Sequence, residues 1–286
     1  MKAIKTTLLL TALTLLLILG GKAIAGTRGM TIGLVIAVVM NGVSYFFSDK
    51  IALRSSGAQP VTHEQAPRLY AVMERLAGKA GLPMPKLYVS PQPAPNAFAT
   101  GRNPHHAAVC VTAGLMQIMN DDELEGVIAH ELSHVRNYDI LTSSIAATLA
   151  GAITWIAEMG RWGMIFGGFG GGSRDNEGEG NAITVILMLF LAPLAALLLQ
   201  LGISRQREYQ ADASGVKMVG HPYGLISALQ KLEGYNKKIP MQISQSTAAL
   251  CIVAPLQARQ MFANLFSTHP PLDDRIEILK HMQITR

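Results

Sequence analysis

Residues 121–139 have the sequence DDELEGVIAHELSHVRNYD, and this stretch decides how the rest of the chain is interpreted. Its apolar residues recur at helical spacing, and acidic residues begin it, where the positive end of a helix dipole favours negative charge. We therefore predict an amphipathic helix with Asn120 or Asp121 as its N-cap. Within it, His130 and His134 belong to an H-E-x-x-H pattern, which places both imidazoles on one face, one turn apart.

The residue types in this pattern are those that a hydrolytic metal site requires. Neutral imidazoles suit Zn2+, and a catalytic zinc ion takes three protein ligands so that a further position can hold water. Bound to the metal, this water ionises near neutral pH and becomes a nucleophile. Glu131, beside His130, would accept a proton from the water and later pass it to a leaving amine. The pattern thus predicts a zinc-dependent hydrolase that needs one more ligand.

The missing ligand is predicted in residues 204–212, SRQREYQAD. Glu208 and Asp212 are four residues apart and would share one face of a helix, where two unpaired carboxylates repel each other. A cation beside them removes this conflict, so Glu208 is predicted as the third ligand. Asp212 could accept a hydrogen bond from a ligand imidazole and fix its tautomer. The alternative, in which both carboxylates pair with neighbouring arginines on a solvated face, is disfavoured beside an H-E-x-x-H pattern.

The composition indicates a membrane protein. Of 286 residues, 49% are hydrophobic and only 15% are charged, and the mean hydropathy is +0.28. The net charge of +5 does not indicate nucleic acid binding, because the basic residues are scattered and no run of them is interleaved with aromatic residues. Cys110 and Cys251 have neither metal-site nor disulfide-framework spacing, so we expect small buried thiols in a reducing compartment.

Four apolar runs predict four membrane spans. Residues 6–20 and 30–47 form a first hairpin, unless the first run is a signal peptide, which the cleavage-like residues 23–25 would allow. Residues 140–157 and 182–203 form a second hairpin around a glycine-rich loop. Both polar segments then lie on the same side of the lipid bilayer. More membrane-flanking lysines and arginines lie on that side, which predicts that it faces the cytoplasm.

The polar segments also carry signals of a small sheet and of later helices. Residues 86–90 are predicted as a strand, and 96–101 with 106–112 as a hairpin. Its first strand, 96–100, is a candidate edge for holding an extended substrate, although plain structural pairing is the alternative. His105 and His106 are interpreted as turn and strand residues. Further helices are predicted at 66–80, 221–232 and 272–282, the last with Ile276 and Leu279 inward.

Three segments together resemble one known family. HELSHVRNYD, then SRQREYQADASG, then FSTHPPLDDRI are similar to the HtpX-type integral-membrane metallopeptidases, relatives of the CaaX prenyl proteases, and the resemblance covers nearly the whole chain. It implies a zinc endopeptidase of the bacterial cytoplasmic (inner) membrane that acts in membrane-protein quality control, with unfolded or misfolded membrane proteins as substrates. It also implies one Zn2+ per chain on His130, His134 and Glu208, with Glu131 as the base.

The same resemblance implies that His269 lies near the metal site, because the histidine of the HPP segment approaches the metal in relatives. We predict that His269 donates a hydrogen bond to the oxyanion of the tetrahedral intermediate. The alternative is a histidine that caps the final helix. Residues 239–255 have no clear period and are a candidate lid over the cleft.

The fold is therefore predicted to be mainly α-helical: a four-span membrane protein with a zincin-like cytoplasmic protease domain that carries a small β-sheet. We divide the chain into a membrane hairpin at 1–48, a first part of the protease domain at 49–139, a second membrane hairpin at 140–203 and a second part of the protease domain at 204–286.

Three other functions agree less well with the sequence. An intramembrane protease is disfavoured, because charged residues flank the motif on both sides. A chaperone or scaffold with a residual zinc site is disfavoured by Glu131, since a structural zinc site fills all four positions with protein ligands and needs no base. A protease specialised for prenylated proteins is less favoured, because four spans leave little room for a large enclosed membrane chamber.

Overall fold

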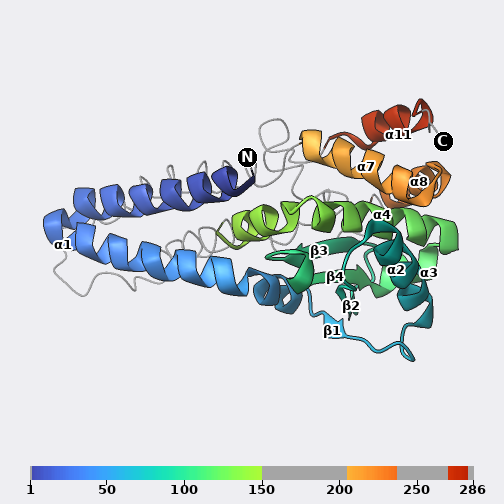
Figure 1. The fold of residues 1–286 in the computed structure, drawn as a ribbon. Helices are drawn as coiled ribbons and strands as arrows, with labels where there is room; N and C mark the ends of the chain where they lie inside the picture. Colours follow the sequence, from blue (N-terminus) through green and yellow to red (C-terminus); the bar gives the residue numbers. More distant parts are fainter. Residues whose placement is uncertain (1, 150–204, 237–269, 283–286) are drawn as a thin grey trace, which may run out of the picture.

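A computed structural model describes residues 2–149, 205–236 and 270–282. A long helical hairpin extends away from a domain in which a small mixed sheet and the other helices pack together (Figure 1). The prediction of a mainly helical fold with a small sheet is confirmed.

The hairpin is α1, Lys2–Ser55, whose two arms run antiparallel (Figure 1). The chain reverses at Gly26, where the φ angle is 61°, a left-handed conformation that glycine adopts without steric cost. The arms approach closely at Gly33, where a Cβ atom would lie 2.2 Å from the carbonyl oxygen of Leu17. A side chain at this position would therefore push the arms apart.

The arms are apolar and expose many large apolar side chains, as contact with lipid requires. The segment Gly26–Ser55 contains an 18-residue window with a mean hydropathy of 1.9 and, within the described part of the chain, is the one helix long and apolar enough to cross a membrane. The first arm contains a shorter apolar helix, Thr6–Leu19. A polar contact joins the arms, because the amide nitrogen of Asn41 donates to Oγ1 of Thr14 at 2.8 Å.

Only the beginning of the predicted second membrane hairpin is described. The helix Asp139–Leu149 packs against the first arm of α1, where Ile145 and Leu13 belong to one buried apolar cluster. The predictions that lie outside the described residues concern the rest of the third span, the glycine-rich loop, the fourth span at 182–203, the candidate lid at 239–255 and His269.

The sheet contains β1 (Gln59–Pro60), β2 (Lys86–Ser90), β3 (Ala97–Gly101) and β4 (Ala107–Thr112), in the order β1-β2-β4-β3. β2 and β4 are parallel, and β3 and β4 form the predicted antiparallel hairpin. A short 3-10 helix, Pro104–His106, joins these two strands. β3 is thus an edge strand, as the prediction for substrate binding requires.

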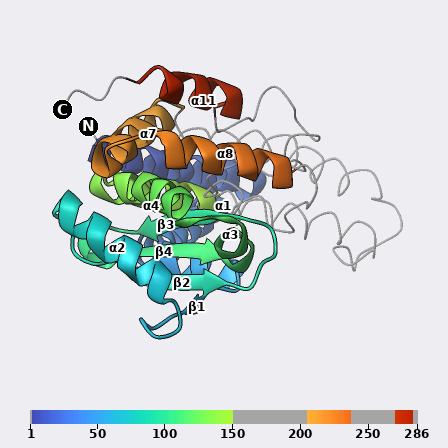
Figure 2. The same ribbon diagram turned by 90° about the vertical axis from the view of Figure 1, so that its right-hand side faces the viewer.

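The motif helix is the centre of the domain. This helix is α4, Asp121–Arg136. It lies between the sheet and α2 on one side and α7 and α8 on the other (Figure 2). The other helices have these bounds: α2 Pro67–Ala80, α3 Ala113–Ile118, α7 Arg205–Val219, α8 Tyr223–Asn236 and α11 Leu272–Lys280. The helices predicted at 66–80, 221–232 and 272–282 are confirmed, with small shifts of their ends.

The beginning of α4 follows the sequence signals closely. Asn120 is the N-cap, and its side chain and that of Glu123 bond reciprocally to each other's backbone N–H groups, which makes a capping box. The predicted apolar stripe is buried throughout: Leu124, Val127, Ile128, Leu132 and Val135. Because other helices cover the opposite face as well, His130 and Glu131 also lie in the interior.

Candidate metal centre

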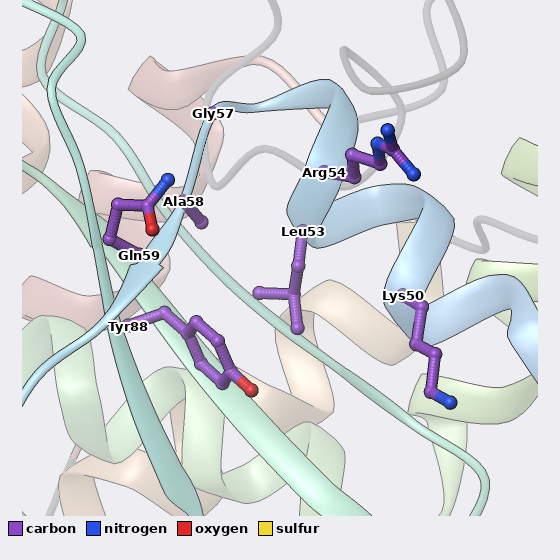
Figure 3. Close-up of a pocket in the computed structure, with 7 residues that line it drawn as sticks. All are labelled: Lys50, Leu53, Arg54, Gly57, Ala58, Gln59 and Tyr88. Atoms are coloured by element: carbon purple, nitrogen blue, oxygen red, sulfur yellow. The ribbon is translucent and has the colours of Figure 1, made fainter.

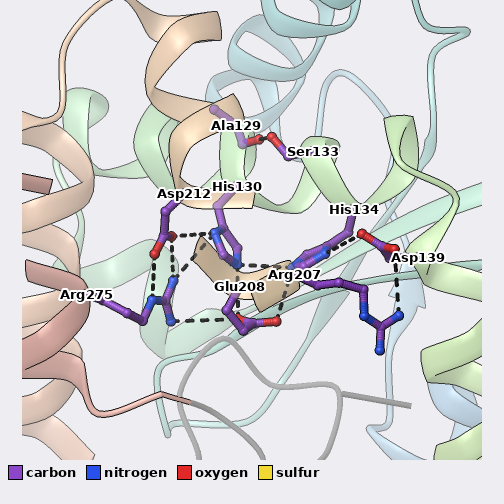
Figure 4. Close-up of polar contacts among 9 residues, drawn as sticks. All are labelled: Ala129, His130, Ser133, His134, Asp139, Arg207, Glu208, Asp212 and Arg275. Carbon is purple, nitrogen blue, oxygen red and sulfur yellow. Dashed lines mark hydrogen bonds and ion pairs between the residues drawn. The ribbon is translucent and has the colours of Figure 1, made fainter. Parts of the chain in front are cut away.

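Two helices that are distant in the sequence bring three possible metal ligands together. His130 and His134 extend from α4, and Glu208 extends from the first turns of α7 (Figure 4). The two Nε2 atoms are 3.2 Å apart, and each lies 3.6 Å from a different carboxylate oxygen of Glu208. A tetrahedral zinc ion with bonds of about 2.1 Å would hold its ligand atoms about 3.4 Å apart. The three side chains therefore fit around one zinc ion.

Behind His130 lies a buried carboxylate paired with a buried guanidinium. Nδ1 of His130 donates to Oδ1 of Asp212 at 2.8 Å, and Arg275 of α11 donates to both oxygens of Asp212 at 2.7 and 2.8 Å (Figure 4). The predicted role of Asp212 in fixing the tautomer of a ligand imidazole thus has the required geometry. With Nδ1 engaged in this way, Nε2 of His130 faces His134 and Glu208.

These contacts also set the pKa values behind the cluster. Burial lowers the pKa of His130, but the hydrogen bond and the charge of Asp212 outweigh burial and raise it to about 9. Burial raises the pKa of Asp212, yet the charge of Arg275 and the bond to His130 bring it below its usual range. A metal ion that bound at His130 would therefore displace a proton.

Behind His134 lies a second, looser pair. Nδ1 of His134 is 3.6 Å from Oδ2 of Asp139, and Oδ1 of Asp139 is 3.6 Å from Nη1 of Arg207 (Figure 4). Asp139 follows α4 after a turn in which Tyr138 has a φ angle of 58°. All three side chains are largely buried.

Glu131 faces the cluster from α4 and is 3% exposed. Burial raises its pKa, because desolvation penalises the carboxylate, while the two histidines act in the opposite direction. The backbone N–H of Ala99, in the edge strand β3, donates to this carboxylate. The predicted base therefore lies close both to the two histidines and to the strand predicted to hold the substrate.

The charges around the cluster also favour a divalent cation. The charged groups described there are four carboxylates and two guanidiniums: Glu131, Asp139, Glu208, Asp212, Arg207 and Arg275. Metal ligation requires neutral histidines, and with the four carboxylates ionised the protein groups then carry two net negative charges in a buried environment, which is costly without a cation. One doubly charged ion would neutralise them, so both the donor atoms and the charge balance suit Zn2+.

The sequence predicted the histidines and most of the carboxylates of this cluster but not the buried arginine behind them. Glu208 and Asp212 are buried, with 5% and 2% exposure, so the alternative of a solvated face is wrong. The prediction for the last helix named Ile276 and Leu279 as inward but missed Arg275, which is fully buried. Its position one residue before Ile276 and four before Leu279 could have indicated the inward face.

A separate cavity of about 270 Å³ lies at the end of α1 (Figure 3). Its lining includes Lys50, Arg54 and Tyr88 but no histidine, cysteine or carboxylate, so it is not a metal site.

These features together are typical of one class of protein, the membrane-bound zinc metallopeptidases. They are two histidines and a glutamate at zinc-ligand spacing, a buried glutamate beside them and an adjacent apolar hairpin. The model of peptidase family M48 matches residues 63–283, and the chain belongs to this family.

Comparison with known proteins supports this assignment over nearly the full length. A protein named protease HtpX homolog from Desulfatibacillum aliphaticivorans is 53% identical over 273 residues, which cover 96% of this chain and 87% of the relative. A protein of the same name from Syntrophobacter fumaroxidans is 50% identical over 279 residues, covering 97% of this chain and 98% of the relative. The predicted resemblance to HtpX-type peptidases is confirmed, and the chain is a zinc-dependent membrane metallopeptidase.

The fold is also found in a solved structure. The crystal structure of S. mikatae Ste24p superposes with a TM-score of 0.53 at 22% identity, covering 98% of this chain and 65% of that chain. The two proteins therefore share a fold.

Proposed function

We propose that His130, His134 and Glu208 hold the zinc ion of this peptidase and that Glu131 is its catalytic base. The observation that carries this proposal is the convergence of the three donor groups, whose ligand atoms lie within 4.8 Å of one another although they come from two separate helices. When bound there, the zinc ion supplies a Lewis acid that polarises the scissile carbonyl and acidifies a water molecule.

Glu131 performs the proton transfers of peptide hydrolysis. Its carboxylate accepts a proton from the attacking water while the water oxygen bonds to the carbonyl carbon. When the C–N bond breaks, Glu131 returns this proton to the leaving nitrogen, so that an acid and an amine are released. The pKa of Glu131, raised by burial, suits a group that must both accept and release a proton.

The edge strand β3 aligns the substrate by backbone pairing. Asn96 bonds with Thr112 toward β4, so by strand alternation Ala97, Ala99 and Gly101 direct their backbone polar groups to the other side. On that side the N–H of Ala99 reaches Glu131. A peptide paired antiparallel or parallel to β3 would therefore pass beside the base in extended form.

His269 completes the cleft in this proposal by donating a hydrogen bond to the oxyanion. Its support is the position of α11: the helix begins at Leu272, shortly after this residue, and its Arg275 contacts Asp212 of the cluster. His269→Ala is expected to lower kcat by about 100-fold, the usual cost of an oxyanion donor. Turnover within a few-fold of the wild type would remove this role.

We further propose that the chain crosses the bacterial inner membrane four times, at the first hairpin 1–48 and the second hairpin 140–203, with the protease parts 49–139 and 204–286 in the cytoplasm. The exposed apolar surface of α1 supports the membrane part of this proposal. Unfolded or misfolded membrane proteins are the proposed substrates. A cysteine at the exposed Asp122 position, in a chain whose native cysteines are replaced by serine, should react with an impermeant maleimide in inside-out vesicles and not in right-side-out vesicles. The reverse labelling would contradict the cytoplasmic placement.

Metal analysis combined with cleavage of an unfolded protein tests the proposed site. The purified wild type should hold one zinc ion per chain and cleave the substrate. Glu131→Gln should keep zinc and lose cleavage, whereas Glu208→Ala should lose both. Glu74→Gln, on an exposed position of α2, is the matched control and should retain both. Cleavage by Glu131→Gln at the wild-type rate would refute the role of the base.

A further inference from the structure

Each of the two imidazoles in the cluster faces a carboxylate on its side away from the other imidazole. For His130 this carboxylate is Asp212, at hydrogen-bond distance. For His134 it is Asp139, at 3.6 Å. The second separation exceeds the usual upper limit of an N–H···O hydrogen bond by about 0.4 Å, so a small rotation of either side chain would close it.

Both carboxylates also contact a buried guanidinium. Asp212 is paired with Arg275, and Asp139 is paired with Arg207, whose side chain is 11% exposed. Among the described residues, Nε and Nη2 of Arg207 are buried without a hydrogen-bond partner, and Asp139 is the carboxylate that pairs with its Nη1. Removing Asp139 would take this carboxylate away from a largely buried guanidinium, which is unfavourable.

The backbone beside this pair is strained. Between α4 and the helix Asp139–Leu149 the chain turns within two residues, and Tyr138 takes the left-handed conformation at a φ angle of 58°. A bulky residue in this conformation is strained, and strain of this kind is concentrated at functional sites. Here the turn brings Asp139 back toward His134.

We propose that Asp139, held by Arg207, is a positioning residue for His134: it accepts the Nδ1 proton and directs Nε2 at the metal. This inference rests on the proposed function, since it assigns His134 to zinc. It gives each histidine ligand its own carboxylate and guanidinium. For His130 these come from α7 and α11, and for His134 they come from the start of the helix Asp139–Leu149 and from α7. Partners of this kind typically change metal affinity by about 10–100-fold.

Zinc affinity, measured by competition with a chromogenic chelator in detergent micelles, tests the proposal without relying on activity. Asp139→Ala should weaken zinc binding by about 10–100-fold and Arg207→Gln by less. In the double variant the two effects should not add, because Arg207 acts through Asp139. The matched controls Asp122→Ala and Arg136→Gln replace exposed residues of α4 and should bind zinc as the wild type does.

A spectroscopic measurement separates positioning from a purely structural role. The visible absorption bands of the Co2+-loaded protein should shift in Asp139→Asn, which keeps the shape of the side chain, and should not shift in the controls. If Asp139→Ala does not fold, the zinc affinity of Asp139→Asn tests the positioning role instead. Wild-type affinity and an unchanged cobalt spectrum in Asp139→Asn would overturn the proposal. That result would leave zinc binding and cleavage by the wild type, on which the proposed function depends, intact.

Discussion

Replacing Arg275 should destabilise the protein strongly even in the absence of metal. Arg275 is fully buried and donates to both oxygens of Asp212, itself 2% exposed, so Arg275→Ala removes the guanidinium from a buried ion pair and leaves His130 as the remaining partner of Asp212. Removing one partner of a buried ion pair costs about 3–5 kcal/mol. Coulomb's law gives a similar value, since unit charges about 4 Å apart attract by about 4 kcal/mol at an effective dielectric constant of about 20.

Urea unfolding in detergent micelles, with a chelator present, measures this loss. The chelator matters because bound zinc would add its own stabilisation and obscure the effect of the ion pair. Arg275→Lys should recover part of the loss, since it retains the charge but not the two parallel hydrogen bonds. Lys280→Ala, at an exposed position of the same helix, should change the free energy of unfolding by less than about 0.5 kcal/mol. A loss below about 1 kcal/mol for Arg275→Ala would refute the reasoning.

Three further predictions concern other parts of the chain. Burial raises the pKa of Glu123, but the contact with Lys231 at 2.7 Å, together with hydrogen bonds from Ser227 and the backbone of Asn120, outweighs burial and lowers the pKa. The stabilisation from the ionised carboxylate is therefore present at neutral pH and is lost as the pH falls. Unfolding between about pH 6 and pH 3 should therefore show a smaller pH dependence in Lys231→Met than in the wild type. Gly33→Ala should destabilise the hairpin by about 1–3 kcal/mol in the same urea assay, whereas Gly42→Ala, where a Cβ has open space, should have little effect. Burial raises the pKa of Cys110 to about 12, so in a Cys251→Ser background the folded protein should resist maleimide and react only on unfolding; rapid labelling would contradict this burial.

Local signals were sufficient to predict much of the fold. The apolar stripe of α4, its N-cap and the β3–β4 hairpin depend on residues that are close in the sequence, so their patterns are visible without a structure. The approach of Glu208 to the two histidines could also be expected, because the H-E-x-x-H pattern needs a further ligand and two carboxylates four residues apart on a helix repel each other without a cation. The sequence could equally place the arms of α1, since two apolar runs with a short link have few other arrangements.

The contacts behind the ligands could not be predicted in the same way. Arg275 follows two acidic residues in a helix, a context typical of an exposed arginine, and its partner Asp212 belongs to a different helix. Asp139 and Arg207 meet only because the turn at Tyr138 redirects the chain. Charged residues become buried where tertiary packing supplies a partner of opposite charge. The sequence around a charged residue does not indicate which distant residue this partner will be.

The short link between α1 and the sheet keeps the protease domain close to the apolar hairpin. The apolar helix ends at Ser55, and β1 begins at Gln59, so at most about 14 Å of extended chain separates the two. With α1 in the lipid bilayer, as we propose, the domain could not move far from the lipid surface.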